Sequence, residues 1–274
     1  MNLRNIEPLL RASRYEVLPT KGAEQAVREW VPTSVTVTVT ASPTKGLEPT
    51  LDLTERLITV GYQVVPHLSA RLVRDSAHLD RLVSRLVAAG VRDVFVPAGD
   101  ADPPAGEFTG ALELLERLSG LGSPFPRVGI TGYPQSHPKI DDDITVQAMW
   151  DKRRHATYIV SNLCFDPAVL RSWIARIRRR GVTLPLLVGL AGPVERTKLM
   201  TMAAKIGVAD SARFAAGHSA VFARLAAPGA YEPGRLLSRL APTLTDPGCL
   251  VEGLHFFTFN QVEQTERWRQ RLLA

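Results

Sequence analysis

Several residues that can exchange protons or bind polar ligands stand near the ends of predicted strands. Asp100 follows the apolar run Val91–Ala98, directly after Gly99. Asp is a common turn residue that bonds its own backbone, so a turn is one interpretation and a functional carboxylate is the other. Further polar side chains at comparable places favour the second interpretation. They are Glu16, Thr40, His67, Tyr133, His137, Asn162, Thr258 and Asn260.

Eight segments rich in β-branched and aromatic residues, bounded by Gly, Pro, Asn or Asp, are typical of strands. They are Tyr15–Pro19, Ser34–Ala41, Tyr62–Ser69, Asp93–Ala98, Arg127–Tyr133, Thr157–Leu163, Pro185–Leu190 and Gly253–Asn260. Amphipathic helical patterns lie between them, among them Ser76–Gly90, Asp166–Gly181 and Val194–Gly207. Asp166 is a candidate N-cap, with Pro167 at the first helical position.

This alternation predicts an α/β fold, a single (β/α)8 TIM barrel domain over residues 1–274. A doubly wound sheet is the competing fold, but no strand–GxGxxG–helix unit is present. The active sites of TIM barrels lie at the C-terminal ends of the strands. The polar residues named above would therefore gather at one mouth of the barrel, with Glu16 inside the first strand.

Composition narrows the classes of partner. The net charge is +6, and basic clusters occur in Asp151–His155 and Arg171–Gly181. No helix-turn-helix, zinc-finger or ribonucleoprotein motif accompanies them, so we expect no nucleic-acid partner. No apolar run approaches the roughly 18 residues of a membrane span, and the N-terminus lacks a signal-peptide pattern, so we expect a cytoplasmic protein with no membrane partner. The sequence leaves open whether the chain forms a homo-oligomer.

Other enzyme classes lack their motifs. There is no GxSxG elbow of a serine hydrolase, and the six histidines form no HExxH motif or comparable cluster, so no metal is expected. Only two cysteines occur, and Cys164 lies in an apolar run, as a small buried hydrophobe would.

Six segments, in order along nearly the whole chain, resemble the methylenetetrahydrofolate reductase family. They are YEVLP at Tyr15–Pro19, VPHLS at Val65–Ser69, AGDADPP at Ala98–Pro104, GYPQSHP at Gly132–Pro138, VSNLCFD at Val160–Asp166 and LHFFTFN at Leu254–Asn260. GYPQSHP is the most specific of them. The family reduces 5,10-methylenetetrahydrofolate to 5-methyltetrahydrofolate with a reduced nicotinamide, through bound FAD.

The resemblance implies roles for three residues. The substrate ring must open to an iminium before hydride attacks, and a carboxylic acid in an apolar setting can protonate the ring nitrogen. Glu16 matches the family's catalytic acid. Asp100 matches the carboxylate that binds the substrate and stabilises the cationic iminium. Asn162 stands where the family has a Gln that holds the pterin, and it is one methylene shorter.

The cofactor pocket is matched only in part. The resemblance assigns cofactor contacts to Thr40, His67, Tyr133 and His137. Elsewhere the sequence departs from the family. Ala98 replaces an Arg that contacts the flavin, and Trp150 and Asp151 stand near the place of a basic segment that grips the FAD phosphates. Thr197 lies near the position at which the family has an aromatic side chain that stacks on folate. His255 matches a histidine of the family, and a packing residue of the core is its other interpretation.

These departures slightly disfavour FAD and favour direct hydride transfer from NADH or NADPH to a folate substrate. Three alternatives stay open. One is an FAD-dependent form of the same reaction, and another is a non-catalytic folate-binding or regulatory barrel. The third is reduction of another folate or pterin.

Overall fold

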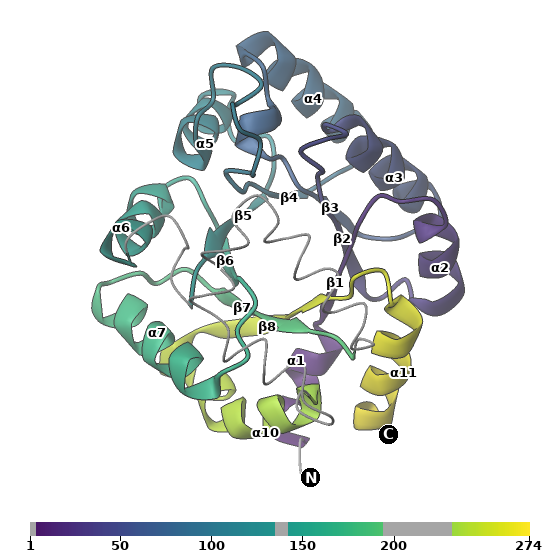
Figure 1. The fold of residues 1–274 in the computed structure, drawn as a ribbon, viewed down its shortest axis with the longest axis vertical. Coiled ribbons are helices and arrows are strands. Elements are labelled where there is room, and N and C mark those ends of the chain that lie inside the picture. Colours follow the sequence, from purple (N-terminus) through teal and green to yellow (C-terminus); the bar gives the residue numbers. More distant parts are fainter. Residues whose placement is uncertain (1–3, 135–141, 194–231) are drawn as a thin grey trace.

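Eight parallel strands form a ring at the centre of the described part of the chain (Figure 1). The computed structural model describes residues 4–134, 142–193 and 232–274. Its strands are β1 (Arg14–Val17), β2 (Thr36–Val39), β3 (Val64–Pro66), β4 (Asp93–Phe95), β5 (Arg127–Gly132), β6 (Tyr158–Ser161), β7 (Leu186–Ala191) and β8 (Val251–Phe257). They are ordered β3-β2-β1-β8-β7-β6-β5-β4. The predicted (β/α)8 barrel is confirmed, and each observed strand overlaps one predicted segment.

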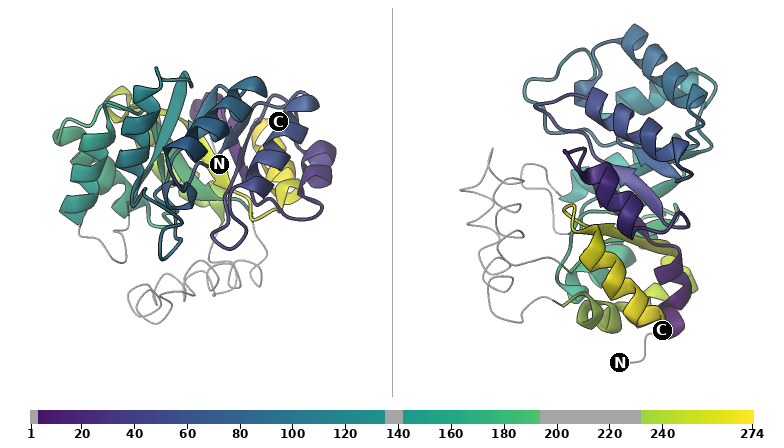
Figure 2. Two further views of the ribbon diagram at one scale, coloured as in Figure 1. Left: turned by 90° about the horizontal axis from the view of Figure 1, so that it is seen from above. Right: turned by 90° about the vertical axis from the view of Figure 1, so that its right-hand side faces the viewer.

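Helices cover the outside of the ring (Figures 1 and 2). They are α1 (Glu7–Arg11), α2 (Ala23–Trp30), α3 (Glu48–Thr59), α4 (Ser76–Ala88), α5 (Ala111–Gly120), α6 (Asp142–Lys152), α7 (Pro167–Arg179), α10 (Pro233–Leu244) and α11 (Val262–Leu273), with short 3₁₀ turns η1 (Arg4–Ile6), η2 (Ala70–Leu72) and η3 (Pro247–Cys249). No helix in these ranges is both long and apolar enough to cross a bilayer.

The predicted helix starts are confirmed at two caps. Asp75 accepts a hydrogen bond from the His78 backbone N–H at 2.6 Å at the start of α4. Asp166 accepts from the Ala168 N–H at 2.8 Å at the start of α7, as expected from its place before Pro167. The helix expected over Val194–Gly207 lies outside the described residues.

The ring closes between β3 and β4 through residues just beyond the strands. A single parallel bridge joins His67 to Phe95. Three backbone hydrogen bonds continue this seam toward the C-terminal side: Leu68 N to Phe95 O at 2.8 Å, Ala70 N to Pro97 O at 3.0 Å and Arg71 N to Ala98 O at 2.9 Å. The seam therefore lies at the end of the barrel where the predicted site residues are expected.

Alternating side chains divide the apolar residues into two cores. Those that point outward, such as Val37, Val39 and Phe256, join the large core between strands and helices. A smaller core fills the interior of the ring and consists of Val65, Phe95, Tyr158, Val160 and Leu187. The interior is thus a packed layer of side chains rather than a channel.

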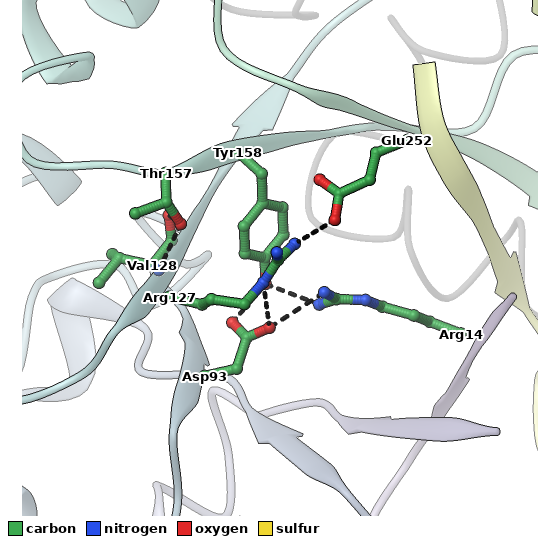
Figure 3. Close-up of polar contacts among 7 residues, drawn as sticks. All are labelled: Arg14, Asp93, Arg127, Val128, Thr157, Tyr158 and Glu252. Atoms are coloured by element: carbon green, nitrogen blue, oxygen red, sulfur yellow. Dashed lines mark hydrogen bonds and ion pairs between the residues drawn. The ribbon is translucent and has the colours of Figure 1, made fainter. Parts of the chain in front are cut away.

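A partly buried polar network occupies the end of the ring at which β1, β4, β5 and β6 begin (Figure 3), with Arg127 and Glu252 at its exposed edge. Asp93 accepts a hydrogen bond from the Tyr158 hydroxyl at 2.8 Å and pairs with Arg14 at 3.0 Å and Arg127 at 3.3 Å. Arg127 also pairs with Glu252 at 2.9 Å. We call Arg14, Asp93, Arg127, Tyr158 and Glu252 the N-terminal plug. Because the plug fills this end with paired charges, the opposite end is the place for a ligand.

Candidate active site

Glu16 points into the barrel because side chains alternate along β1. Tyr15 faces outward, and its hydroxyl donates to Glu266 of α11 at 2.6 Å. Arg14 and Glu16 face inward, with Arg14 in the plug and Glu16 nearer the C-terminal mouth. The Glu16 side chain is 16% exposed, so it is a largely buried carboxyl group that still reaches solvent.

Two histidines flank the Glu16 carboxyl group. His255 in β8 brings its Nε2 to 3.1 Å from Glu16 Oε2. His67, one residue beyond β3, places its Nε2 3.6 Å from the same oxygen. Both imidazoles are buried. The barrel thus joins three titratable residues that are far apart in the sequence.

Burial controls the charge of His67. Desolvation lowers the pKa of His67 to about 4, although the Glu16 carboxylate acts in the opposite direction. His255 acts in the same direction as burial. His67 is therefore a neutral imidazole at pH 7.

Asp100 stands at the mouth on a turn that glycine makes possible. Gly99 has a φ of +88°, in the left-handed region that L side chains rarely adopt, and a Cβ there would lie 3.0 Å from Ser69 Cβ. The next residue, Asp100, is exposed. Burial raises the pKa of Tyr133, and the charge of Asp100 acts in the same direction. Asp100 is therefore near enough for its charge to act on the Tyr133 phenol, which follows β5.

No hydrogen bond or ion pair among the described residues joins Asp100 to Glu16. The site has two separate acidic positions: Glu16 inside the ring, and Asp100 on the loop after β4. A ligand between them would meet a largely buried acid on one side and a solvated carboxylate on the other.

Asn162 and Thr40 lie directly after β6 and β2. The Asn162 backbone N–H donates to Gly132 O at 2.7 Å, and its Oδ1 accepts from the Leu163 N–H at 2.8 Å. Its exposed side chain keeps two amide donors on Nδ2 for which the described residues supply no partner. Thr40 is half-buried, with its backbone N–H bonded to Val17 O at 3.0 Å. Both residues therefore lie at the C-terminal end of the barrel.

Three other predicted positions have different outcomes. His137 lies outside the described residues. Thr258 is buried, and its hydroxyl donates to the Glu16 carbonyl at 2.6 Å. The Asn260 Oδ1 accepts a hydrogen bond from the Leu18 backbone N–H at 2.8 Å, and its Nδ2 donates to the Leu18 carbonyl at 3.1 Å. Thr258 and Asn260 therefore hold β8 and the residues after it against β1, which fixes the strand that carries Glu16.

A comparison of the sequence with models of known protein families identifies the family of this chain. The family model described as methylenetetrahydrofolate reductase matches residues 22–227, more than half of the chain. The chain belongs to the methylenetetrahydrofolate reductase family. The match places it among folate-dependent one-carbon reductases. Glu16 and His255 fall outside the matched range, so their assignment rests on the motifs and on the contacts described above.

Solved structures resemble the chain in fold only. A putative phosphonomutase from Burkholderia cenocepacia J2315 is 9% identical, with a TM-score of 0.51 and coverage of 99% of this chain and 96% of that one. A crystal structure of oxaloacetate acetylhydrolase is 12% identical, with a TM-score of 0.50 and coverage of 89% and 97%. At such identities the likeness shows the barrel and nothing about the reaction.

The residues at two positions do not fit the FAD phosphates of a methylenetetrahydrofolate reductase. Ala98 offers only its backbone carbonyl, which accepts the Arg71 N–H in the seam. Asp151 on α6 presents an exposed carboxylate that accepts from Gln147 at 2.8 Å. An alanine and a carboxylate supply none of the charge-assisted bonds that a pyrophosphate takes from basic side chains. Thr197, the third departure from the family, lies outside the described residues.

The contact of His255 with Glu16 is the feature of the site that sequence reasoning missed. The pairing of β1 with β8 puts Arg14 beside His255 and Glu16 beside Phe257. Alternation in LHFFTFN indicates that His255 and Phe257 share one face. Without the register between β1 and β8, the sequence did not show that this face meets Glu16.

Proposed function

We propose that the chain reduces 5,10-methylenetetrahydrofolate to 5-methyltetrahydrofolate, with the hydride coming directly from NADH or NADPH and without bound flavin. The observation that carries the proposal is the Glu16 carboxyl group, largely buried at the C-terminal mouth in a chain of this family. The mismatch at Ala98 and Asp151 supports the flavin-free form.

Glu16 delivers its proton to the ring nitrogen of the substrate, and the five-membered ring opens to a cationic iminium. Reduced nicotinamide, when bound, supplies the hydride that adds to the iminium carbon. A carboxyl group within reach of the ring nitrogen can act as the general acid in this step.

Asp100 places a negative charge where the iminium develops its positive charge, an arrangement that stabilises the transition state more than the neutral substrate. Asn162 binds the pterin through its free amide donors. Thr40, Tyr133 and His137 are assigned to the nicotinamide, and His67 is assigned to the wall between Glu16 and that pocket.

The first experiment is an absorbance spectrum of the purified protein after incubation with FAD and desalting, followed by an NADH or NADPH oxidation assay. We expect no band near 450 nm and oxidation that depends on methylenetetrahydrofolate. A retained flavin band with turnover would instead establish the FAD-dependent reaction. Folate binding without turnover would establish a non-catalytic barrel, and turnover with a different folate or pterin alone would reassign the substrate.

The Glu16→Gln variant tests the acid. Glutamine keeps the shape of the side chain but has no proton to deliver, so kcat should fall by about 10²-fold or more, with folate binding retained. Glu263→Gln on the surface of α11 serves as the matched control and should turn over normally. Normal turnover in Glu16→Gln would show that another group is the acid.

A further inference from the structure

Both histidines at the site approach the same oxygen of Glu16. The Nε2 atoms of His255 and His67 lie 3.1 Å and 3.6 Å from Oε2. Glu16 Oε1 forms no hydrogen bond with a described residue, and it is not among the buried atoms that lack a partner. The carboxyl group therefore has one oxygen enclosed by imidazoles and one oxygen open to solvent.

The remaining nitrogen of His255 indicates which tautomer is present. His255 Nδ1 is buried and has no hydrogen-bond partner. A buried N–H without a partner costs about 1–3 kcal/mol, so the proton belongs on Nε2, where it can be donated to Glu16. An imidazolium would carry a proton on both nitrogens and leave one of them unsatisfied. The geometry thus favours a neutral His255 with an Nε2–H.

Aromatic neighbours fix both rings. The His67 ring lies 4.8 Å from Phe95 between centroids, and the His255 ring lies 4.8 Å from Phe257. Phe95 belongs to the β4 side of the seam, and Phe257 is the β8 partner of Glu16 in the strand register. The two imidazoles therefore come from opposite sides of β1 and have little freedom to turn away from it.

Few charged groups other than the histidines bear on Glu16. Arg14 faces the same interior from two positions earlier on β1, but its guanidinium is engaged by Asp93 at 3.0 Å and Tyr158 at 2.9 Å in the N-terminal plug. The neighbours on β2 and β3 are the uncharged Thr38 and Val65. The hydrogen bond with His255 is thus the main polar contact of the carboxyl group, and the buried His67 Nε2 at 3.6 Å has no hydrogen-bond partner.

We propose that His255 is a positioning residue for Glu16: as a neutral imidazole it donates its Nε2–H to Oε2 in the barrel interior and so directs Oε1, which carries the proton, toward the substrate, with His67 lying against the same oxygen without a hydrogen bond. The inference rests on the proposed function. An uncharged donor suits this role, because it holds Oε2 without placing a positive charge beside the acid.

A matched pair of variants at position 255 tests the proposal. Gln places an amide N–H close to the position of the imidazole Nε2–H, whereas Met has a similar length and no donor. We expect His255→Met to lower kcat by about tenfold or more with a KM for folate within about twofold of wild type, the signature of a group that acts in the transition state. His255→Gln should restore most of kcat.

The pH profile separates positioning from general damage to the fold. A carboxylate that loses a hydrogen-bond donor holds its proton more tightly. The basic limb of the kcat profile should therefore move to higher pH in His255→Met and stay near wild type in His255→Gln. A lower kcat with an unmoved limb, or equal loss in the Met and Gln variants, would overturn the positioning role.

Histidine NMR tests the proposal without turnover. The chain has six histidines, so ¹⁵N-histidine spectra can be assigned from the signals missing in the His67→Gln and His255→Gln variants. We expect both residues to be neutral at pH 7, with His255 as the Nε2–H tautomer. An imidazolium or an Nδ1–H tautomer at His255 would overturn the proposal even in an active enzyme. Loss of turnover in the wild type with the expected spectra would refute the proposed function and leave this arrangement standing.

Discussion

Asp100 owes its proposed role to position rather than to burial. It is exposed and next to Gly99, and its charge acts on Tyr133. Asp100→Asn keeps the size of the side chain and removes the charge. We expect kcat to fall by about 10²-fold, the scale found when one preorganised electrostatic group is removed, with little change in the free energy of unfolding.

Asp102→Asn is the matched control for this prediction. Asp102 lies on the same loop with a side chain that is 78% exposed, and it pairs with Arg71 at 3.5 Å. A steady-state assay should find the Asp102 variant close to wild type. An equal loss in both variants would mean that the loop needs negative charge in general and that Asp100 has no special role.

His67 gives the protein a stability that depends on pH. Burial lowers the pKa of His67 to about 4 from 6.5 in the unfolded chain. Between these values the unfolded state binds the proton and the folded state does not, so stability falls as pH falls. The free energy of unfolding should decrease by about 3 kcal/mol from this residue between pH 7 and pH 4.

Urea unfolding of wild type and His67→Gln at pH 7, 5.5 and 4.5 measures this effect. The variant should lose much less stability over this range. His155→Gln, at a partly buried histidine bonded to Ser119, is the matched control for replacing an imidazole that is not fully buried. A His67 variant with the same slope as wild type would show that other groups cause the acid sensitivity.

At the scale of elements, the turn after β4 depends on Gly99 in two ways: the backbone is left-handed there, and there is no space for a Cβ. Gly99 and Gly90 have similar φ angles, +88° and +85°, but a Cβ on Gly99 would lie 3.0 Å from Ser69 whereas a Cβ on Gly90 would meet nothing within 4 Å. Each change to Ala should cost roughly 1–2 kcal/mol of stability for the left-handed conformation. Only Gly99→Ala should also reduce kcat, because the Ser69 contact displaces Asp100.

Thermal unfolding and the oxidation assay on these two variants separate backbone strain from displacement of the site. If Gly90→Ala lost as much kcat as Gly99→Ala, the activity would depend on overall stability rather than on the geometry of this turn.

Local sequence patterns predicted the elements well but not the contacts between them. The β-branched runs located the strands, and Asp166–Pro167 located the start of α7, because these signals act over a few residues. The predicted strands are longer than the observed ones: Tyr62–Ser69 pairs as a ladder only over Val64–Pro66. Beyond it, the chain makes the bridge and loop bonds of the seam instead.

Interactions that join distant segments could not be predicted in this way. Arg14, Asp93 and Tyr158 look like ordinary residues at the starts of strands until parallel register brings them together in the N-terminal plug (Figure 3). The same holds for His255 beside Glu16. Register and closure depend on packing across the whole ring, and alternation alone carries no information about the partner strand.

For the whole molecule, the plug implies that the two ends of the barrel have separate roles. Tyr158→Phe removes the hydroxyl that donates to Asp93 at 2.8 Å and accepts from Arg14 at 2.9 Å. Asp93 and Arg14 each lose one hydrogen bond, which should lower the free energy of unfolding by about 1–3 kcal/mol. Because Tyr158 lies at the end opposite the site, kcat of the folded variant should remain within about twofold of wild type.

Chemical unfolding should be compared with Tyr62→Phe, which removes a buried hydroxyl whose partners among the described residues are the Val27 and Val31 carbonyls. The smaller loss is expected in Tyr62→Phe, because its partners are uncharged. A large loss of kcat in Tyr158→Phe, with stability retained, would contradict the separation of the two ends.

The backbone bonds of the seam between β3 and β4 leave the side chain at position 98 free to vary. Its cohesion comes from backbone groups, and the Ala98 carbonyl accepts the Arg71 N–H whatever side chain position 98 carries. The wall is therefore free to gain or lose an arginine without opening the cylinder. Under the proposed function, a substitution at position 98 would change the contacts to the hydride donor while the strand that carries Glu16 stays in register.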